Sequence, residues 1–209
     1  MKTIIKEITR KKNYYEVRTE YAVYEIDGEF VRQYHLQPST YFEEESLREL
    51  HQKSRFRRAY RRACYLLDER DYSYCIMYQK LMHTYQDREL CDHVMDQLVQ
   101  CGAINDRRYA ERYAEFLIAT RKYGIHRARL EMLRKGLDKH LIEEALSAYE
   151  ETAETQVFEV LAKKYGSILI DPQDMKTRNK ALSGMLRLGY DYASVRNAIE
   201  NYFAEQEDD

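Results

Sequence analysis

Side chains able to do covalent or metal chemistry are few and scattered in this sequence. Its four cysteines (Cys64, Cys75, Cys91 and Cys101) show no C-x-x-C spacing, and its six histidines are dispersed; zinc sites and redox pairs require closer spacing. The sequence contains no phosphate-binding glycine loop, no H-E-x-x-H motif and no nucleophile elbow. We therefore predict a protein that is not an enzyme and that uses no cofactor or metal. Its cysteines are expected to be reduced, buried thiols, and the repeat described below supports this for Cys91.

Basic side chains are the groups that could act, by binding an anionic partner. The first basic group follows Lys53 and is interleaved with aromatic residues; it consists of Arg55, Arg57, Arg58, Arg61 and Arg62. Like charges three or four residues apart on a helix repel by roughly a few tenths of a kcal/mol per pair. An anionic partner would relieve that repulsion and release counterions. The alternative is a solvated helix face, partly neutralised by acidic residues close in sequence such as Glu49 and Asp68.

A second basic group lies in the middle of the chain and consists of Arg107, Arg108, Arg121, Lys122, Arg127, Arg129, Arg134 and Lys135. Arg127 and Arg134 are seven residues apart, opposite the apolar positions Ala128 and Met132, so both are expected to point outward. Glu131 lies between them and offsets part of the charge. The functional interpretation is contact with DNA phosphates or with an acidic protein surface. The alternative is an ordinary solvated helix face.

Tyrosine is abundant, with twenty copies and no tryptophan. Tyrosines could stack on nucleic-acid bases. Most of them, however, fall at apolar stripe positions, among them Tyr109, Tyr113, Tyr149 and Tyr202. Packing against the core is therefore the favoured interpretation.

Composition limits the class of protein. The formal net charge is −2, so the overall charge does not indicate a nucleic-acid binder. Hydrophobic residues make up 44% of the chain, and there are only two prolines and seven glycines, which favours a helical protein with a real core. No apolar run approaches the roughly 20 residues of a membrane span, and no secretion signal is recognisable, so we expect a cytoplasmic location.

The first forty residues differ from the remainder and predict a small β meander. Three short segments rich in β-branched and aromatic residues are followed by Asp27-Gly28, a strong hairpin signal. The predicted strands are residues 4–8, 14–19 and 21–26, with a last strand at about 29–36. Ser39 or Thr40 is then expected to cap a helix over about residues 42–52.

From Arg55 onward the pattern is helical and repeats. Three turn segments align without gaps: Tyr85-Gln86-Asp87, Gly136-Leu137-Asp138 and Gly189-Tyr190-Asp191. The residues around them form one apolar stripe per helix, and each aspartate is a natural N-cap of a third helix. The period is about fifty residues, which predicts three tandem three-helix units.

We therefore predict a mainly α-helical fold in which three tandem three-helix repeats form an elongated, curved rod, preceded by a small β-rich segment. Neighbouring units this short must share core contacts. The predicted division is residues 1–54 for the β-rich extension with a linker helix, and 55–104, 105–152 and 153–209 for the three repeats. The acidic tail (Glu205, Glu207, Asp208 and Asp209) is expected to be frayed and solvated.

The middle unit resembles a known family. The segment from Ile104 to Tyr113, together with its continuation through Gly136-Leu137-Asp138 and the helix up to Leu146, is similar to the most characteristic part of the RecX family of recombination regulators. The resemblance covers about residues 58–203. Members are similarly built from three three-helix repeats, and the longer ones carry a β-rich N-terminal extension. The chain departs from the family pattern at Tyr85-Gln86, where a glycine followed by an aromatic or aliphatic residue is usual, and at Ile76.

The resemblance implies a protein, expected to be monomeric, that binds the RecA recombinase, chiefly as the filament RecA forms on single-stranded DNA. Such a protein would lie in the filament groove and restrain ATP hydrolysis, filament growth and strand exchange, and thereby regulate homologous recombination and DNA repair. The two basic groups would contact RecA or DNA. Two alternatives are a helical-repeat protein that binds DNA directly, and a scaffold for another protein partner.

Overall fold

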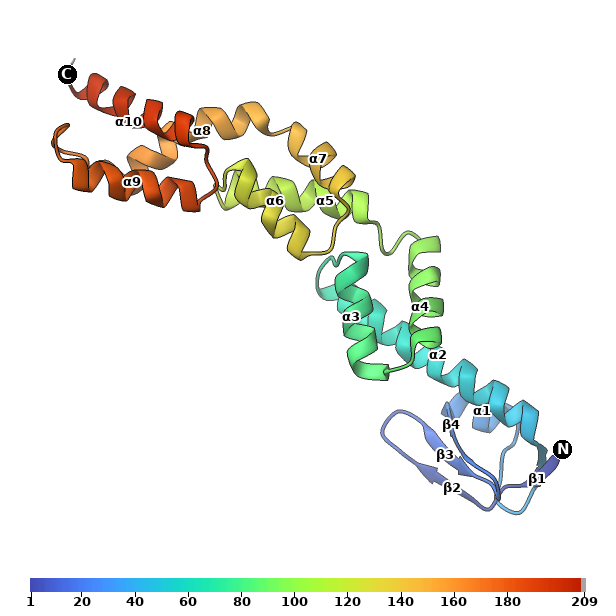
Figure 1. Cartoon of the computed structure of the whole chain (residues 1–209). Coiled ribbons are helices and arrows are strands. Elements are labelled where there is room, and N and C mark those ends of the chain that lie inside the picture. Colours follow the sequence, from blue (N-terminus) through green and yellow to red (C-terminus); the bar gives the residue numbers. More distant parts are fainter. Residues whose placement is uncertain (208–209) are drawn as a thin grey trace. The chain divides into compact units, whose positions relative to one another are not determined.

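The structure is a computed structural model that describes residues 1–207, so Asp208 and Asp209 of the predicted acidic tail lie outside the described residues. It comprises two compact units: residues 1–71 with 77–103, and residues 72–76 with 104–209. None of the helices in the described part is both long and apolar enough to cross a membrane. Figure 1 follows the order of the elements along the chain.

The N-terminal segment forms two small antiparallel sheets. Strand β1 (Lys2–Ile4) pairs with β5 (Tyr41–Glu43), and β2 (Glu7–Arg10), β3 (Tyr15–Arg18) and β4 (Val23–Ile26) form a three-stranded meander. In this meander Val17 pairs with Ile8 on one side and with Tyr24 on the other. Val17 and Tyr24 are buried in one core with Leu47 of the following helix, so the meander packs on that helix.

The segment after β4 corrects the predicted meander. A short helix, α1 (Gly28–Gln33), occupies the place of the expected strand at residues 29–36, and Asp27 precedes it with extended backbone. Asp27-Gly28 is therefore a helix start rather than a hairpin, because aspartate is favoured before a helix as well as in a turn. As a helix, the segment packs Phe30 and Val31 against the same core.

The predicted cap of the next helix is also wrong. Ser39 has a positive φ of 65°, and the Thr40 hydroxyl donates to the Gln37 carbonyl at 2.6 Å, so neither side chain caps a helix. Residues 41–43 form β5 because they pair with β1, and helix α2 begins only at Glu44. The long-range pairing with the first strand overrides the local capping signal.

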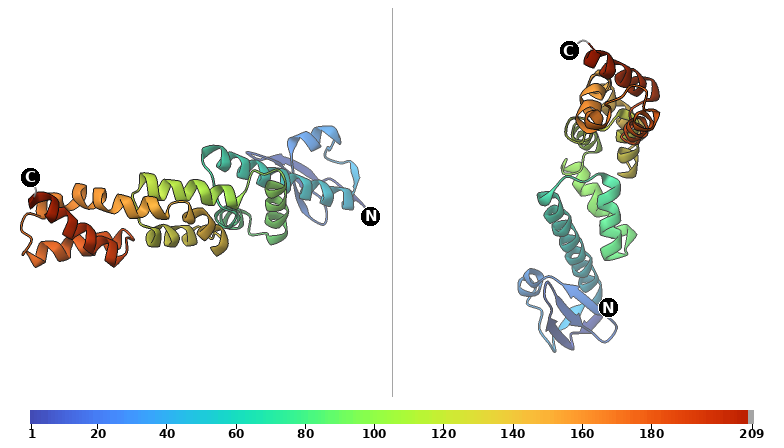
Figure 2. Two further views of the ribbon diagram at one scale, coloured as in Figure 1. Left: turned by 90° about the horizontal axis from the view of Figure 1, so that it is seen from above. Right: turned by 90° about the vertical axis from the view of Figure 1, so that its left-hand side faces the viewer.

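Helix α2 (Glu44–Glu69) runs without interruption for 26 residues. It contains no glycine or proline and starts with two glutamates that suit the helix N-terminus. Figure 2 shows the β-rich segment beside the N-terminal part of this helix. The predicted division between residues 54 and 55 therefore falls inside one continuous helix, which serves both the β-rich segment and the first three-helix unit.

The remaining elements are helical. In chain order they are α3 (Tyr74–Tyr85), α4 (Arg88–Gln100), α5 (Asp106–Glu115), a π-helix (Phe116–Thr120), α6 (Ile125–Arg134), α7 (Lys139–Ser147), α8 (Glu150–Tyr165), a 3₁₀ turn (Gly166–Ile168), α9 (Met175–Arg187) and α10 (Tyr192–Glu207). The predicted fold class, mainly helical with three-helix units after a small β-rich segment, is confirmed.

The turns before the third helices are built as their sequences predict. Asp87, Asp138 and Asp191 each accept a backbone hydrogen bond from the first turn of the following helix. Gly136 and Gly189 have φ values of 71° and 90°, in the region where only glycine is unstrained. In the first unit the residue with positive φ is Gln86 (51°), which lies directly before its Asp cap, one residue closer to the cap than Gly136 and Gly189 are to theirs.

The apolar stripes form the cores. Ala128, Met132 and Ile142 are buried in the middle unit, and Ala181 and Met185 in the third. All four cysteines are free thiols and Cys91 is fully buried, as predicted. The predicted burial is wrong for Cys101, which is exposed, and only partly met by Cys64 and Cys75, which are half-buried. Two stripe positions, Leu133 and Leu186, are instead exposed by 38% and 39%.

Candidate interaction surface

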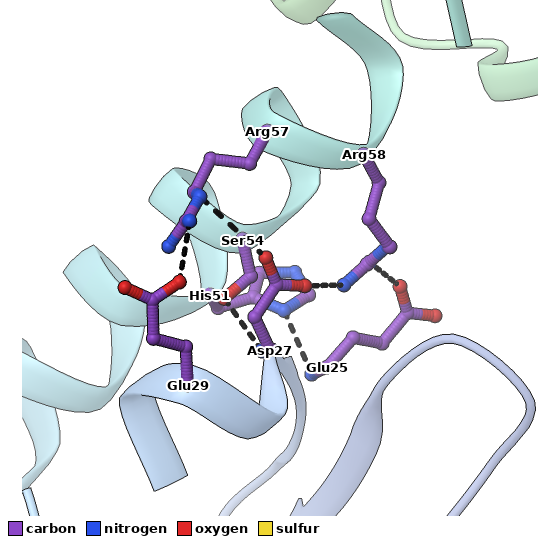
Figure 3. Close-up of polar contacts among 7 residues, drawn as sticks. All are labelled: Glu25, Asp27, Glu29, His51, Ser54, Arg57 and Arg58. Carbon is purple, nitrogen blue, oxygen red and sulfur yellow. Dashed lines mark hydrogen bonds and ion pairs between the residues drawn. The ribbon is translucent and has the colours of Figure 1, made fainter. Parts of the chain in front are cut away.

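The arginines of the first basic group are largely committed to contacts within the chain. Arg57 forms an ion pair with Glu29 at 2.5 Å, and Arg58 pairs with Glu25 and, at 3.4 Å, with Asp27 (Figure 3). The acidic partners come from β4 and the start of α1, far from α2 in sequence. These ion pairs attach the β-rich segment to α2.

Two neutral contacts complete this attachment. The backbone amide of Asp27 donates to the Ser54 hydroxyl, and that of Glu25 donates to Nδ1 of His51, both at 2.9 Å (Figure 3). Burial lowers the pKa of His51 below its ordinary value of 6.5, and the positive charge of Arg55 acts in the same direction. His51 is therefore neutral at pH 7, as its role as a hydrogen-bond acceptor requires.

The remaining arginines of this group differ in whether they form an ion pair. Arg55 binds Asp87 at the start of α4 at 2.7 Å. Of the nearby acidic residues expected to neutralise the group, Glu49 pairs with the preceding Lys53 at 3.6 Å instead. Arg61 and Arg62 are exposed, and within residues 1–207 neither has a carboxylate at ion-pair distance. Arg62 lies over the ring of Tyr65, 5.7 Å from its centroid.

In the middle unit, the cations beside α7 are neutralised. Arg129 binds Glu143 through two parallel hydrogen bonds of 2.6 and 2.7 Å, and Arg107 pairs with Glu144. The hydrogen bond with Glu143 raises the pKa of Arg129, and the same bond lowers the pKa of Glu143. These two arginines tie α5 and α6 to α7.

Helix α5 and the π-helix that follows it carry a row of aromatic rings. Tyr109 and Tyr113 are stacked with centroids 5.6 Å apart, and Tyr113 and Phe116 are stacked at 6.3 Å. Tyr109 and Tyr113 also pack against the core of the middle unit, which confirms the predicted core packing, while Phe116 is 42% exposed. Burial raises the pKa of Tyr113, and the nearby Glu131 carboxylate adds to that shift.

Cations cover these rings. Arg121 lies 5.5 Å from the centroid of Phe116, and the Lys135 ammonium lies 5.6 Å from that of Tyr113. Both distances suit cation–π attraction. Arg127 covers the ring of Tyr123 in the same way at 4.7 Å.

Among the described residues, Glu131 is the carboxylate that pairs with cations here. Glu131 binds Arg127 at 3.5 Å and Arg134 at 3.0 Å, as expected from its position between them. We call this surface the basic aromatic face; it consists of Tyr109, Tyr113, Phe116, Arg121, Tyr123, Arg127, Glu131, Arg134 and Lys135.

The π-helix positions Phe116 and Arg121 of the basic aromatic face. The Arg121 amide donates to the Phe116 carbonyl five residues earlier at 3.0 Å, so the helix is wider here than an α-helix. Leu117 and Ile118 are buried while Phe116 faces solvent. Sequence analysis did not identify Phe116 or Tyr123 as contact residues. The i, i+4, i+7 spacing of Tyr109, Tyr113 and Phe116 could have indicated that these three rings form one stacked row.

Hydrogen bonds connect the basic aromatic face to the third unit. The guanidinium of Arg127 donates to the Arg187 carbonyl at 2.9 Å, and the Tyr190 hydroxyl donates to the Lys122 carbonyl at 3.1 Å. Arg127 is thus only partly outward, with 37% of its side chain exposed against 69% for Arg134. This corrects the expectation that both point away from the protein, because the third unit packs beside Arg127.

Fold and surface together define a class: a helical protein of three-helix units that presents a basic, aromatic face. The family model described as the second three-helix domain of RecX matches residues 105–146, the part of the chain that carries this face.

Curated relatives agree with that match. Regulatory protein RecX of Chlorobium phaeobacteroides is 27% identical over 147 residues, covering 70% of this chain and 95% of that protein. Regulatory protein RecX of Stenotrophomonas maltophilia is 29% identical over 137 residues, covering 66% of this chain and 82% of that protein. For the Streptococcus sanguinis relative, 28% identical over 120 residues, the match spans 45% of its length.

Solved structures show the same fold. A crystal structure of regulatory protein RecX matches 93% of this chain and 99% of its own with a TM-score of 0.67 at 18% identity. RecX from Lactobacillus salivarius matches 73% of this chain with a TM-score of 0.60 at 21% identity. The family model, the curated relatives and the solved structures thus agree that this chain is similar to RecX regulatory proteins.

Proposed function

We propose that this protein is a cytoplasmic, non-enzymatic regulator that binds RecA, chiefly the RecA filament on single-stranded DNA, and restrains its ATPase, filament growth and strand exchange. Similarity to the RecX family supports this proposal, since the curated relatives are named as regulatory proteins. The basic aromatic face is the proposed contact surface. The observation that carries this assignment is that Arg121 and Lys135 lie over a row of aromatic rings, beside Arg127 and Arg134, which both bind the Glu131 carboxylate.

The chemistry of the face suits an acidic protein surface. Tyrosine and arginine are enriched at the energetic centres of protein interfaces, because they bury large areas and form directional contacts. Stacking on Tyr113 and Phe116 holds Lys135 and Arg121 in place before a partner arrives, so less side-chain entropy is lost on binding.

The remaining predicted contact residues take different parts in this proposal. Arg55, Arg57, Arg58, Arg107 and Arg129 already hold internal carboxylates, so we assign them to the stability of their units. Arg61, Arg62, Arg108 and Lys122 stay as predicted partner contacts outside the face.

The test is the ATPase rate of RecA on single-stranded DNA, titrated with this protein from sub-stoichiometric to equimolar ratios. The proposal expects inhibition well below equimolar protein. A variant with Arg121→Glu, Arg134→Glu and Lys135→Glu should lose most of that inhibition. Its matched control is Lys163→Glu, Lys164→Glu and Lys180→Glu, which makes the same charge change at exposed lysines of the third unit.

The outcomes separate two parts of the proposal. No effect of the wild-type protein on the ATPase, with no co-sedimentation on the filaments, would refute RecA regulation and favour a scaffold for another partner. Equal inhibition by wild type and by the Arg121/Arg134/Lys135 variant would leave RecA regulation intact but remove the basic aromatic face from it.

Direct binding of nucleic acid is a second candidate function, favoured by the exposed Phe116 at the end of the stacked row. Bases stack on such rings regardless of sequence. Salt dependence distinguishes the two functions, because affinity for phosphates falls steeply with salt while RecA-dependent binding need not.

A further inference from the structure

A hollow of about 320 Å³ lies in the N-terminal segment, between the β2–β3 connection, α1 and α2. Its lining is mainly polar, and five cations contribute to it: Arg10, Lys11, Lys12, Arg32 and Arg61. We call it the basic hollow. It is separate from the basic aromatic face, which lies on α5 and α6.

The acidic side chains that line the basic hollow already form ion pairs with arginines of α2. Glu29 binds Arg57 at 2.5 Å, and Asp27 is within 3.4 Å of Arg58. Neither Arg57 nor Arg58 lines the hollow. The charge of these two carboxylates therefore does little to offset the lining cations.

Most of the lining cations have no such partner. Lys11 binds Glu16 at 3.3 Å. Within the part of the chain that the structure describes, Arg10, Lys12, Arg32 and Arg61 have no carboxylate at ion-pair distance. Four unneutralised cations from three elements thus converge on one small space.

Neighbouring contacts hold this geometry. A Cβ on Gly28 would lie 2.8 Å from the ring of Tyr15 and 3.6 Å from the guanidinium of Arg32, so the absence of a side chain lets α1 lie directly on β3. Arg58 lies over the ring of Tyr14 at 4.7 Å and fixes the start of β3 against α2. The wall of the hollow is therefore packed on the core of the segment rather than left as a loose loop.

We propose that the basic hollow binds the phosphate backbone of a single-stranded nucleic acid. Consecutive phosphates carry a full charge on every nucleotide and can satisfy several converging cations without an apolar anchor. A protein partner of this hollow would need an apolar centre, which the mainly polar lining does not offer. A flexible strand can also enter a space that is walled from three sides.

The test measures binding of a short fluorescein-labelled oligothymidine by fluorescence anisotropy, without RecA and over a range of salt concentrations. The variant combines Arg10→Glu, Lys12→Glu and Arg32→Glu, which are exposed positions with no carboxylate at ion-pair distance in the described part of the chain. The control is again Lys163→Glu, Lys164→Glu and Lys180→Glu. The variant should bind roughly tenfold more weakly or worse at low salt, and its salt slope should fall by about 2, since each single-strand phosphate contact contributes about 0.7.

Three results would overturn the proposal. The wild-type protein could fail to bind the oligonucleotide, or the control could weaken binding as much as the variant, which would reflect overall charge alone. Polyglutamate could also compete as well as unlabelled oligothymidine per charge, which would indicate an acidic protein partner. Circular dichroism checks that the variant is folded. Failure here leaves the proposed RecA regulation untouched, because the variant retains the basic aromatic face.

Discussion

Gly189 supports the face from the third unit, and replacing it with alanine should be costly for two reasons. Its φ is 90°, where a non-glycine residue is strained by about 1–2 kcal/mol. A Cβ there would also lie 2.3 Å from the backbone nitrogen of Arg127, which is closer than any real contact. The chain must shift, and with it the hydrogen bonds from the Gly124 amide to the Leu188 carbonyl (2.8 Å) and from the His126 amide to the Gly189 carbonyl (3.3 Å).

The magnitude follows from these two contributions. Losing two backbone hydrogen bonds costs about 1–3 kcal/mol in net terms. Gly189→Ala should therefore lower the free energy of unfolding by about 2–5 kcal/mol when both contributions are included. Gly102 is the matched control, because its φ is 71° but a Cβ would meet nothing within 4 Å. Gly102→Ala should cost only the backbone strain of about 1–2 kcal/mol.

The assay is urea unfolding followed by circular dichroism, with each variant compared with wild type. Because Arg127 belongs to the basic aromatic face, Gly189→Ala should also weaken inhibition of RecA at temperatures where the variant is still folded, whereas Gly102→Ala should not. Equal destabilisation by the two substitutions would refute the argument that contact with Arg127, rather than backbone conformation alone, makes Gly189 necessary.

Three further predictions concern single side chains. The pKa of His51 is lowered in the folded state, so the folded protein binds a proton at His51 less readily than the unfolded chain does. The free energy of unfolding should therefore fall as the pH drops below about 6.5. His51→Gln should reduce the difference in urea midpoint between pH 7.5 and pH 5.5. A larger pH dependence in that variant would contradict the assignment of His51 as a neutral acceptor. A double-mutant cycle on Arg129 and Glu143 should give a coupling of about 0.5–1 kcal/mol that shrinks with added salt, since both groups are partly exposed; a salt-independent coupling would argue against an ion pair. Cys91→Ser should lower the free energy of unfolding by about 1–3 kcal/mol, because it places a hydroxyl in a fully buried site, and an unshifted melting temperature would mean that the site is accessible to water.

The helical part of the fold was accessible from sequence because its signals are local. The aspartate caps act over two or three residues, and Gly136 and Gly189 supply the positive φ that their turns require. The N-terminal segment was less accessible, since residues 41–43 became a strand only by pairing with the first strand of the chain. The local capping signal at Ser39 and Thr40 could not predict that partner.

The candidate site divides in the same way. The sequence identified Arg127, Arg134 and Lys135 as cations on helix surfaces, because helical periodicity assigns each residue to a side of its helix. It did not reveal which cations hold internal carboxylates. Arg58 and Glu25 form an ion pair although they are 33 residues apart in sequence, so their contact depends on the folded chain.

The three-helix units, their buried stripes and the basic character of the middle unit can therefore be predicted from sequence, since helix periodicity and caps depend on neighbours within one or two turns. The ion pairs by which Arg57 and Arg58 attach the β-rich segment to α2, and the convergence of Arg10, Arg32 and Arg61 on one hollow, appear only in the folded chain. Those arrangements depend on packing between segments distant in sequence, which no local pattern encodes.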